Sequence, residues 1–259
     1  MSARLEGNAA AEWQAHWPVV LAACSGAAMS AVSSYSTSLF FEPLEREFGW
    51  SRVDITSVHL FGSIFVILFG PLVGHTVDRL GARRAGIAAV FALTIAFSVL
   101  GLTSSSIWMW RAMWVILAAV SVLFQPFIWS SAVTSFFSAG RGFALAVTLC
   151  GTSICSVVTP PLTVYLIDQF GWRLAFPALI GCWTLVVLPL VLLFFTSKAD
   201  QARKGAPATQ ASAPHPSFFK AFRNEALTPK FLQLLAAGFS IALVVVSMAM
   251  TIVPILSSE

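Results

Sequence analysis

Seven long runs without a charged side chain dominate this sequence, and they constrain its fold more than any other feature. Each run exceeds the length of about 20 apolar residues that a helix needs to cross a membrane. Because lipid offers no hydrogen-bond partners to the backbone, such runs cross it as helices. The sequence therefore predicts an all-α integral membrane protein with seven transmembrane helices. The uncharged runs that indicate these helices are 17–41, 55–77, 85–110, 112–140, 142–167, 174–197 and 231–258.

Basic residues are distributed unevenly over the connections between these spans. With a cytoplasmic N-terminus, 11 of the 15 Lys and Arg residues fall on the cytoplasmic side. Arg46, Arg52, Arg111 and Arg173 fall on or toward the other side. This bias follows the positive-inside rule. We therefore expect a multi-pass protein of the cell inner membrane with its N-terminus in the cytoplasm. The net charge of +4 orients the chain and gives no reason to expect a nucleic-acid partner.

Spans three and four are expected to meet around 103–107, four and five around SAGRG at 138–142, and five and six around DQFGWR at 168–173. These connections are short, so successive helices are expected to be neighbours. We expect a cytoplasmic tail at 1–16, a six-helix bundle at 17–197, a cytoplasmic central loop at 198–230 and the first helix of a second bundle at 231–259. Many transporters consist of two similar bundles in tandem. The layout is that of such a transporter cut after the first helix of its second bundle.

The connection between spans two and three, GHTVDRLGARR at 74–84, concentrates charge in a chain in which only 10% of residues are charged. A carboxylate at Asp78 is stabilised there by the positive end of a neighbouring helix or by an arginine. Gly74 allows close approach of another helix, and Gly81 permits the turn back into the membrane. We interpret the motif as a latch that closes when two bundles meet, with Arg141 as its partner. The predicted cytoplasmic gate residues are Gly74, Asp78, Arg79, Gly81, Arg83, Arg84 and Arg141.

In its spacing of glycines, acid and arginines, this motif resembles the loop between helices two and three of the major facilitator superfamily, MFS. The stretches 35–52, 136–151 and 170–176 are similar to bacterial members of its monocarboxylate-transporter-like and oxalate/formate-exchanger-like branch. The resemblance covers the chain from residue 17 onward. It implies the MFS fold of twelve helices in two bundles, alternating access to a central site, and small organic anions as common cargo. The helix-one signature of animal monocarboxylate carriers and the glycine-proline motif of drug exporters are absent from this sequence.

Polar side chains inside the predicted spans are candidates for binding the substrate. Arg111 lies about a turn inside span four, where a guanidinium is costly unless it faces water, an acid or a substrate carboxylate. The alternative is that it snorkels to the interface among neighbouring tryptophans. His59 could couple protons, or could simply donate a hydrogen bond between helices. Hydroxyl and amide groups in spans one and four could line a cavity or serve helix packing. The substrate-binding candidates are Arg111, Tyr35, Thr37, Gln125 and His59.

Several other classes of site are not expected. The four cysteines lie inside predicted spans, without metal-ligand spacing, and are interpreted as small buried hydrophobes. The sequence contains no P-loop, H-E-x-x-H or G-x-S-x-G motif, so we expect no enzyme, no cofactor and no metal. A retinal protein is excluded because the last span lacks the lysine that a Schiff base needs.

The sequence thus predicts a secondary transporter that works by alternating access without ATP. The expected substrate is a small organic anion such as a monocarboxylate, carried by symport or antiport, with protons as a candidate coupling ion. The lipid bilayer is its other partner. The alternative is a truncated membrane protein, derived from such a carrier, that does not transport because a half-built cavity cannot alternate. Substrate identity, direction and oligomeric state are not specified by these residues.

Overall fold

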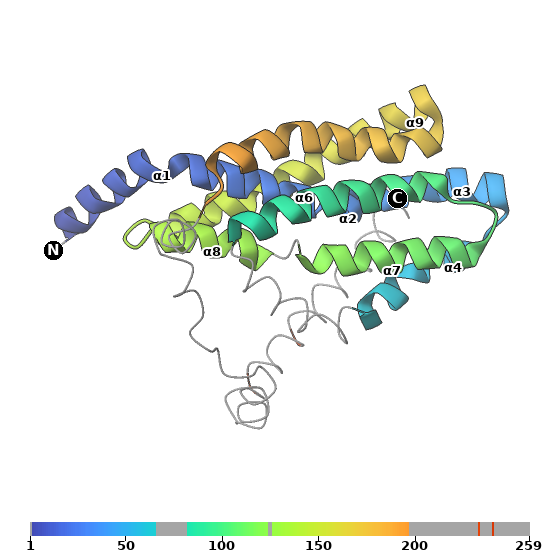
Figure 1. Cartoon of the computed structure of the whole chain (residues 1–259), viewed down its shortest axis with the longest axis horizontal. Coiled ribbons are helices and arrows are strands. Elements are labelled where there is room, and N and C mark those ends of the chain that lie inside the picture. The colour runs from blue at the N-terminus through green and yellow to red at the C-terminus, as the bar shows by residue number, and fades with distance from the viewer. Residues whose placement is uncertain (1, 66–81, 124–125, 197–232, 234–239, 241–259) are drawn as a thin grey trace, which may run out of the picture. The chain divides into compact units, whose positions relative to one another are not determined.

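The computed structural model describes residues 2–65, 82–123, 126–196, 233 and 240 (Figure 1). The chain divides into two compact units, Met1–Pro207 and Ala208–Glu259, and all the helices below belong to the first unit. The predicted central loop, most of the seventh span and the second half of span two lie outside the described residues.

Every element assigned in the described part is helical, which confirms the expected all-α fold. A further stretch, 58–65, is also helical. The elements are α1 (Ser2–Ser30), α2 (Val32–Ser36), the 3-10 helix η1 (Thr37–Phe40), α3 (Phe41–Phe48), α4 (Arg52–Thr56), α6 (Ala82–Val99), the 3-10 helix η2 (Leu100–Leu102), α7 (Ile107–Leu123), α8 (Pro126–Phe136) and α9 (Arg141–Phe194).

Among the described residues, two helical segments are long and apolar enough to cross a membrane, Arg83–Leu102 and Arg141–Phe194. A third span results if Ala9–Ser30 and Val32–Phe48, joined at a bend of 42°, are counted together. The apolar helix Ile107–Ser121 is shorter. The described part therefore contains fewer separate spans than the seven predicted. One reason is that α9 joins the predicted spans 142–167 and 174–197.

A single glycine divides α9 into two segments. Gly171 has φ 74° and ψ 160°, which lie outside the helical region. Glycine adopts a positive φ without the steric penalty that a Cβ atom would bring. The chain therefore turns at this residue, within the short connection that the sequence predicts between spans five and six.

The connection between α6 and α7 carries no charged residue and falls in the hydroxyl-rich stretch 103–106. The side chain of Thr103 donates a hydrogen bond to the carbonyl of Leu100 at 2.6 Å. Serine and threonine compete with helix formation by bonding nearby backbone groups in this way. The expected meeting point of spans three and four, around 103–107, is thus confirmed.

Helix α1 packs mainly against α9 and α8, and small residues allow these contacts. A Cβ atom added at Gly151 of α9 would lie 2.0 Å from the carbonyl oxygen of Cys24 in α1. A Cβ atom added at Gly26 would lie 2.5 Å from the ring of Trp129 in α8. The helices therefore approach too closely for any side chain at these positions, as is common where membrane helices cross.

An aromatic cluster around Phe176 forms the centre of the core. Its ring stacks on Phe40 with centroids 3.9 Å apart, and the ring of Phe97 lies 5.3 Å away. Trp110 lies 6.5 Å from Phe176 and is fully buried. Such aromatic pairs add about 0.5–1.5 kcal/mol beyond the burial of their area. Phe176 thus joins η1, α6, α7 and α9.

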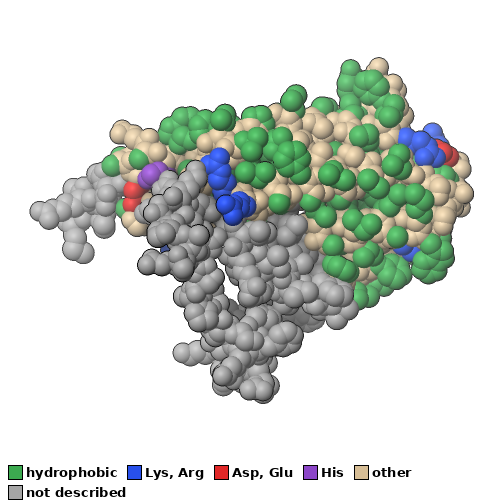
Figure 2. All heavy atoms as spheres, in the orientation of Figure 1, with side chains coloured by type: hydrophobic (Ala, Val, Ile, Leu, Met, Phe, Trp, Pro, Cys, Tyr) green, Lys and Arg blue, Asp and Glu red, His purple; other side chains and the backbone are tan. Residues whose placement is uncertain are grey.

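Charged side chains gather at two ends of this unit, with apolar side chains covering the face between them (Figure 2). We call these ends the Arg141 end and the Arg173 end. Contacts between Arg83 and Leu192 and between Glu12 and Gly140 mark the first, whereas a contact between Arg173 and Glu47 marks the second. Large apolar side chains that are exposed along the helices suit a surface facing lipid.

The expectation of buried cysteines is wrong for two of the four. Cys155 is buried and Cys24 is half-buried, but Cys150 and Cys182 are exposed, and all four are free thiols. An exposed position in a membrane span can face lipid, and a small apolar side chain lies there at little cost.

Candidate functional site

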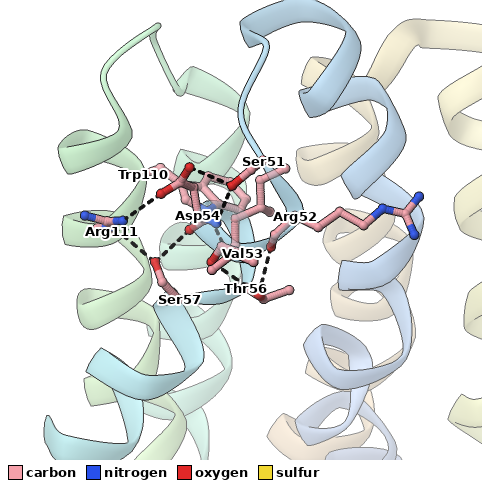
Figure 3. Close-up of polar contacts among 9 residues, drawn as sticks. Ser51, Arg52, Val53, Asp54, Thr56, Ser57, Trp110 and Arg111 are labelled. Atoms are coloured by element: carbon pink, nitrogen blue, oxygen red, sulfur yellow. Dashed lines mark hydrogen bonds and ion pairs between the residues drawn. The ribbon is translucent and has the colours of Figure 1, made fainter.

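Arg111 lies in the second turn of α7 and pairs with an acid on α4 (Figure 3). Its Nη2 atom donates to Oδ1 of Asp54 at 3.3 Å, and its Nε atom donates to Oγ of Ser57 at 3.1 Å. The side chain of Arg111 is 18% exposed, against 50% for Asp54. The partly buried guanidinium thus has an acidic partner. Such a partner is one of the three environments, with water and a substrate carboxylate, that offset the cost of a charge at this depth.

The cap of α4 holds Asp54 in place for this contact. Ser51 is the N-cap residue, and its Oγ atom accepts a hydrogen bond from the backbone N–H of Asp54 at 3.2 Å. The same hydroxyl donates to Oδ2 of Asp54 at 2.7 Å. This Ser-x-x-Asp arrangement is a capping-box pattern. It leaves Oδ1 of Asp54 for Arg111, while Arg52 points away and bonds Glu45 at 2.8 Å (Figure 3).

Sequence reasoning did not identify Asp54 and Ser57 as partners of Arg111. The available signal was the capping pattern SRVD at 51–54, which predicts the start of a helix and a fixed carboxylate at its third residue, Asp54. The pattern does not predict which cation that carboxylate meets, because the pair joins residues 57 positions apart.

Aromatic rings surround the rest of this site. The guanidinium carbon of Arg111 lies 4.9 Å from the ring centroid of Trp108 and 5.6 Å from that of Phe61, within the range of cation–π contacts. Trp114 is buried, and its indole N–H has no hydrogen-bond partner among the described residues. The ring of His59 lies 5.1 Å from that of Trp114. Since Arg111 and Trp114 are three residues apart on α7, they share a face of that helix.

The other substrate-binding candidates do not join this cluster in the described part of the chain. Tyr35 is 41% exposed on α2, whereas Thr37 is buried and its hydroxyl donates to the backbone carbonyl of Ser33. Gln125 lies outside the described residues, so its predicted role stays a prediction.

Much of the predicted gate motif, from Gly74 to Gly81, also lies outside the described residues. Arg83 lies in the first turn of α6, and its Nη2 atom donates to the carbonyl of Leu192 at 2.6 Å. Leu192 belongs to the last turn of α9, where a cation interacts favourably with the helix dipole. Arg84 is exposed, and Arg141 is exposed at the first position of α9.

A second ionic cluster joins three connections at the Arg173 end. Glu47 accepts a hydrogen bond from the indole of Trp172 at 2.6 Å and another from Nη2 of Arg173 at 2.6 Å. Nη1 of Arg173 donates to the carbonyl of Thr103 at 2.7 Å. These bonds tie α3 to the turn at Gly171 and to the α6–α7 connection. The hydrogen bond from Arg173, followed by that from Trp172, lowers the pKa of Glu47 below the ordinary 4.5.

We expect Glu47→Gln to lower the melting temperature at pH 7 by a few degrees, because a partly exposed ion pair contributes about 1 kcal/mol at most. A carboxylate whose folded-state pKa is lowered stabilises the fold fully above its ordinary pKa and loses that contribution as the pH falls through the folded-state value. Thermal unfolding of both proteins in detergent should therefore show a difference that is constant above pH 5 and shrinks below pH 4.5. A difference that persists unchanged at pH 3 would contradict this assignment. Glu42→Gln, in an exposed pair with Arg46, is the matched control.

The match to a protein family extends over almost all of the helices described above. The model of the Major Facilitator Superfamily matches residues 23–259, more than half of the chain. This chain belongs to the major facilitator superfamily. The family comprises transporters, so the expectation that this member is not an enzyme agrees with the family. Its apolar helices also agree with a multi-pass membrane protein.

Two curated transporters resemble this superfamily member over part of its length. Riboflavin transporter RibJ of Trypanosoma brucei brucei is 26% identical over 162 residues, which cover 60% of this chain and 30% of that protein. MFS transporter asaE of Aspergillus flavus is 33% identical over 132 residues, which cover 48% of this chain and 28% of that protein. The matched part of the chain thus spans less than a third of either relative.

Proposed function

We propose that this protein is a secondary transporter that moves a small organic anion, such as a monocarboxylate, by alternating access. The match to the superfamily over residues 23–259 carries the proposal that it transports. The stretches 35–52, 136–151 and 170–176, which resemble the bacterial monocarboxylate and oxalate/formate branch, support the choice of an anion.

We assign the chain to two bundles, with a six-helix bundle at 17–197, a central loop at 198–230 and the first helix of the second bundle at 231–259. The Arg141 end faces the cytoplasm of a cell whose inner membrane holds the protein. The distribution of Lys and Arg over the whole sequence supports this orientation, since 11 of the 15 fall on the side of Arg83, Arg84 and Arg141. Cytoplasmic connections are typically rich in Lys and Arg.

Arg111 is the proposed attractor for the anion. Its guanidinium is only 18% exposed, and an incoming carboxylate would exchange with the more exposed Asp54 for the same donors. Arginine presents a donor fork that matches the geometry of a carboxylate. The unpartnered indole N–H of Trp114 supplies a further donor on the same face of α7. Tyr35 and His59, both exposed, are proposed as further lining residues of the central cavity.

Uptake by cells that express the protein tests the proposal directly. The panel comprises radiolabelled monocarboxylates, oxalate, formate and riboflavin, with vector-only cells as the control. Saturable uptake of a carboxylate above the control supports the proposal. Riboflavin is included because a relative is a riboflavin transporter. Uptake of riboflavin alone would replace the anion with that substrate, and uptake of none of them at normal membrane level would contradict it.

The gate motif has its own expected result. If Asp78 closes a cytoplasmic latch, Asp78→Asn should reduce the rate of uptake without lowering the amount of protein in the membrane, since only a charge is removed. Initial uptake rates, normalised by immunoblot of the membrane fraction, check this expectation. Unchanged uptake would count against the latch.

A further inference from the structure

The carboxylate of Glu12 in α1 binds a turn that lies 126 residues later in the chain. The hydroxyl of Ser138 donates to Oε1 of Glu12 at 2.6 Å, and the backbone N–H of Ser138 donates to Oε2 at 3.1 Å. The next two amides also donate, Ala139 to Oε1 at 3.2 Å and Gly140 to Oε2 at 3.0 Å. One side chain therefore satisfies three consecutive N–H groups immediately before α9.

Aromatic packing extends this contact along α1. The ring of Trp13 lies 5.4 Å from that of Phe137 and 5.3 Å from that of Phe143. The imidazole of His16 lies 4.6 Å from the ring of Phe136. Glu12, Trp13 and His16 therefore contact the turn and both helices that flank it, α8 and α9.

The charge of Glu12 suits its place. Backbone N–H groups at the start of a helix carry partial positive charge and favour an anion. The hydrogen bond from the Ser138 hydroxyl, followed by that from the Gly140 N–H, lowers the pKa of Glu12 from 4.5 to about 2. The carboxylate is therefore ionised across the physiological pH range.

The contact also bears on Arg141, the next residue along the chain. A cation at the first position of a helix faces the unfavourable end of the helix dipole. Glu12 places a negative charge beside the N–H groups that lead into this residue. No other backbone hydrogen bond from the amides of residues 138–140 is assigned within the described residues. Among the described residues, the carboxylate of Glu12 is thus the acceptor for the backbone N–H groups of this turn.

We propose that Glu12 is a positioning residue for the gate: it docks the segment 9–16 onto the turn 138–140 and thereby holds Arg141 and the start of α9 in place while the transporter cycles. The segment is then a working part of the bundle and not only a tail that precedes it. The second half of this proposal rests on the proposed transport function, whereas the docking does not.

Hydrogen–deuterium exchange of the whole chain in detergent tests the docking. In Glu12→Gln, an amide NH2 replaces one oxygen that accepts from backbone N–H groups, so the amides of residues 138–140 should exchange at least about tenfold faster than in the wild type. Ser138→Ala removes only the hydroxyl donor and should give a smaller increase at residues 139 and 140. Glu42→Gln, at the Arg173 end, is the matched control and should leave these amides unchanged. Unchanged exchange in Glu12→Gln would overturn the docking.

Transport kinetics test the positioning role. Glu12→Gln should change the maximal rate several-fold at an unchanged KM, because the substrate site is untouched, and Glu12→Asp should restore part of the rate. Faster amide exchange together with wild-type kinetics would overturn the link to the gate. If the wild type transports no member of the panel, the proposed function fails, while the exchange result still decides the docking.

Discussion

Gly151→Ala is expected to destabilise the protein, because it adds a methyl group where α9 meets the backbone of α1. The new Cβ atom would lie 2.0 Å from the carbonyl oxygen of Cys24 and 3.0 Å from the backbone nitrogen of Ala28. Both obstacles are backbone atoms of α1, so they cannot move aside without shifting a helix. Overpacking of this kind costs about 1–3 kcal/mol. The melting temperature in detergent, followed by size-exclusion chromatography after heating, should fall by several degrees.

Gly181→Ala is the matched control for this experiment, because a Cβ atom at that position of α9 meets nothing within 4 Å. Alanine has a higher helix propensity than glycine by about 1 kcal/mol. The control variant should therefore be as stable as the wild type or slightly more stable. Equal melting temperatures for the two variants would show that α1 and α9 do not cross as closely as described.

Arg111→Gln is expected to lower kcat/KM for the anionic substrate by at least about tenfold, since a charge-assisted hydrogen bond to a carboxylate is lost from a partly buried site. Arg52→Gln provides the matched control. It lies at the same end, bonds Glu45 and points away from the site (Figure 3). Uptake rates across a range of substrate concentrations, normalised for membrane level, separate the two variants.

Asp54→Asn distinguishes attraction of the substrate from a purely structural role of Arg111. If the substrate carboxylate competes with Asp54, neutralising that acid should lower KM for the anion. If Arg111 only ties α7 to α4, Asp54→Asn and Arg111→Gln should reduce stability alike and leave KM unchanged. A fall in KM with Asp54→Asn and a loss of uptake with Arg111→Gln are therefore the paired results that we expect.

The all-α class and several of the connections were predictable from the sequence, whereas the bounds of individual helices were not. Uninterrupted apolar length predicts a span, and the hydroxyl-rich stretch 103–106 and the glycine at 171 lie where the structure ends or breaks its helices. These signals are local, because each depends on residues within a few positions of one another. The positions of exposed cysteines were not predictable in this way. A residue in a span can face either the protein or the lipid, and uniformly apolar sequence hides the difference.

The partners of the candidate site were beyond the sequence. Arg111 was identified as a costly charge, but Asp54 and Ser57 were not identified as the groups that satisfy it. The role of Glu12 was also missed, because a single acid near the N-terminus has no local pattern that points to residues 138–140. Which side chains meet depends on how each helix is rotated about its axis and how closely two helices cross, and glycines such as Gly151 set that distance.

The sequence by itself determined that this chain is a helical membrane protein, where several of its connections fall, and which superfamily motif it carries. Hydrophobic length, turn residues and charge spacing are properties of short segments and can be read without a fold. The tertiary structure alone decided that Glu12 caps the turn before α9, that Arg173 ties three connections together, and that Arg111 pairs with Asp54. Each of these contacts joins residues at least 57 positions apart, and only the packing of helices brings them within hydrogen-bond distance.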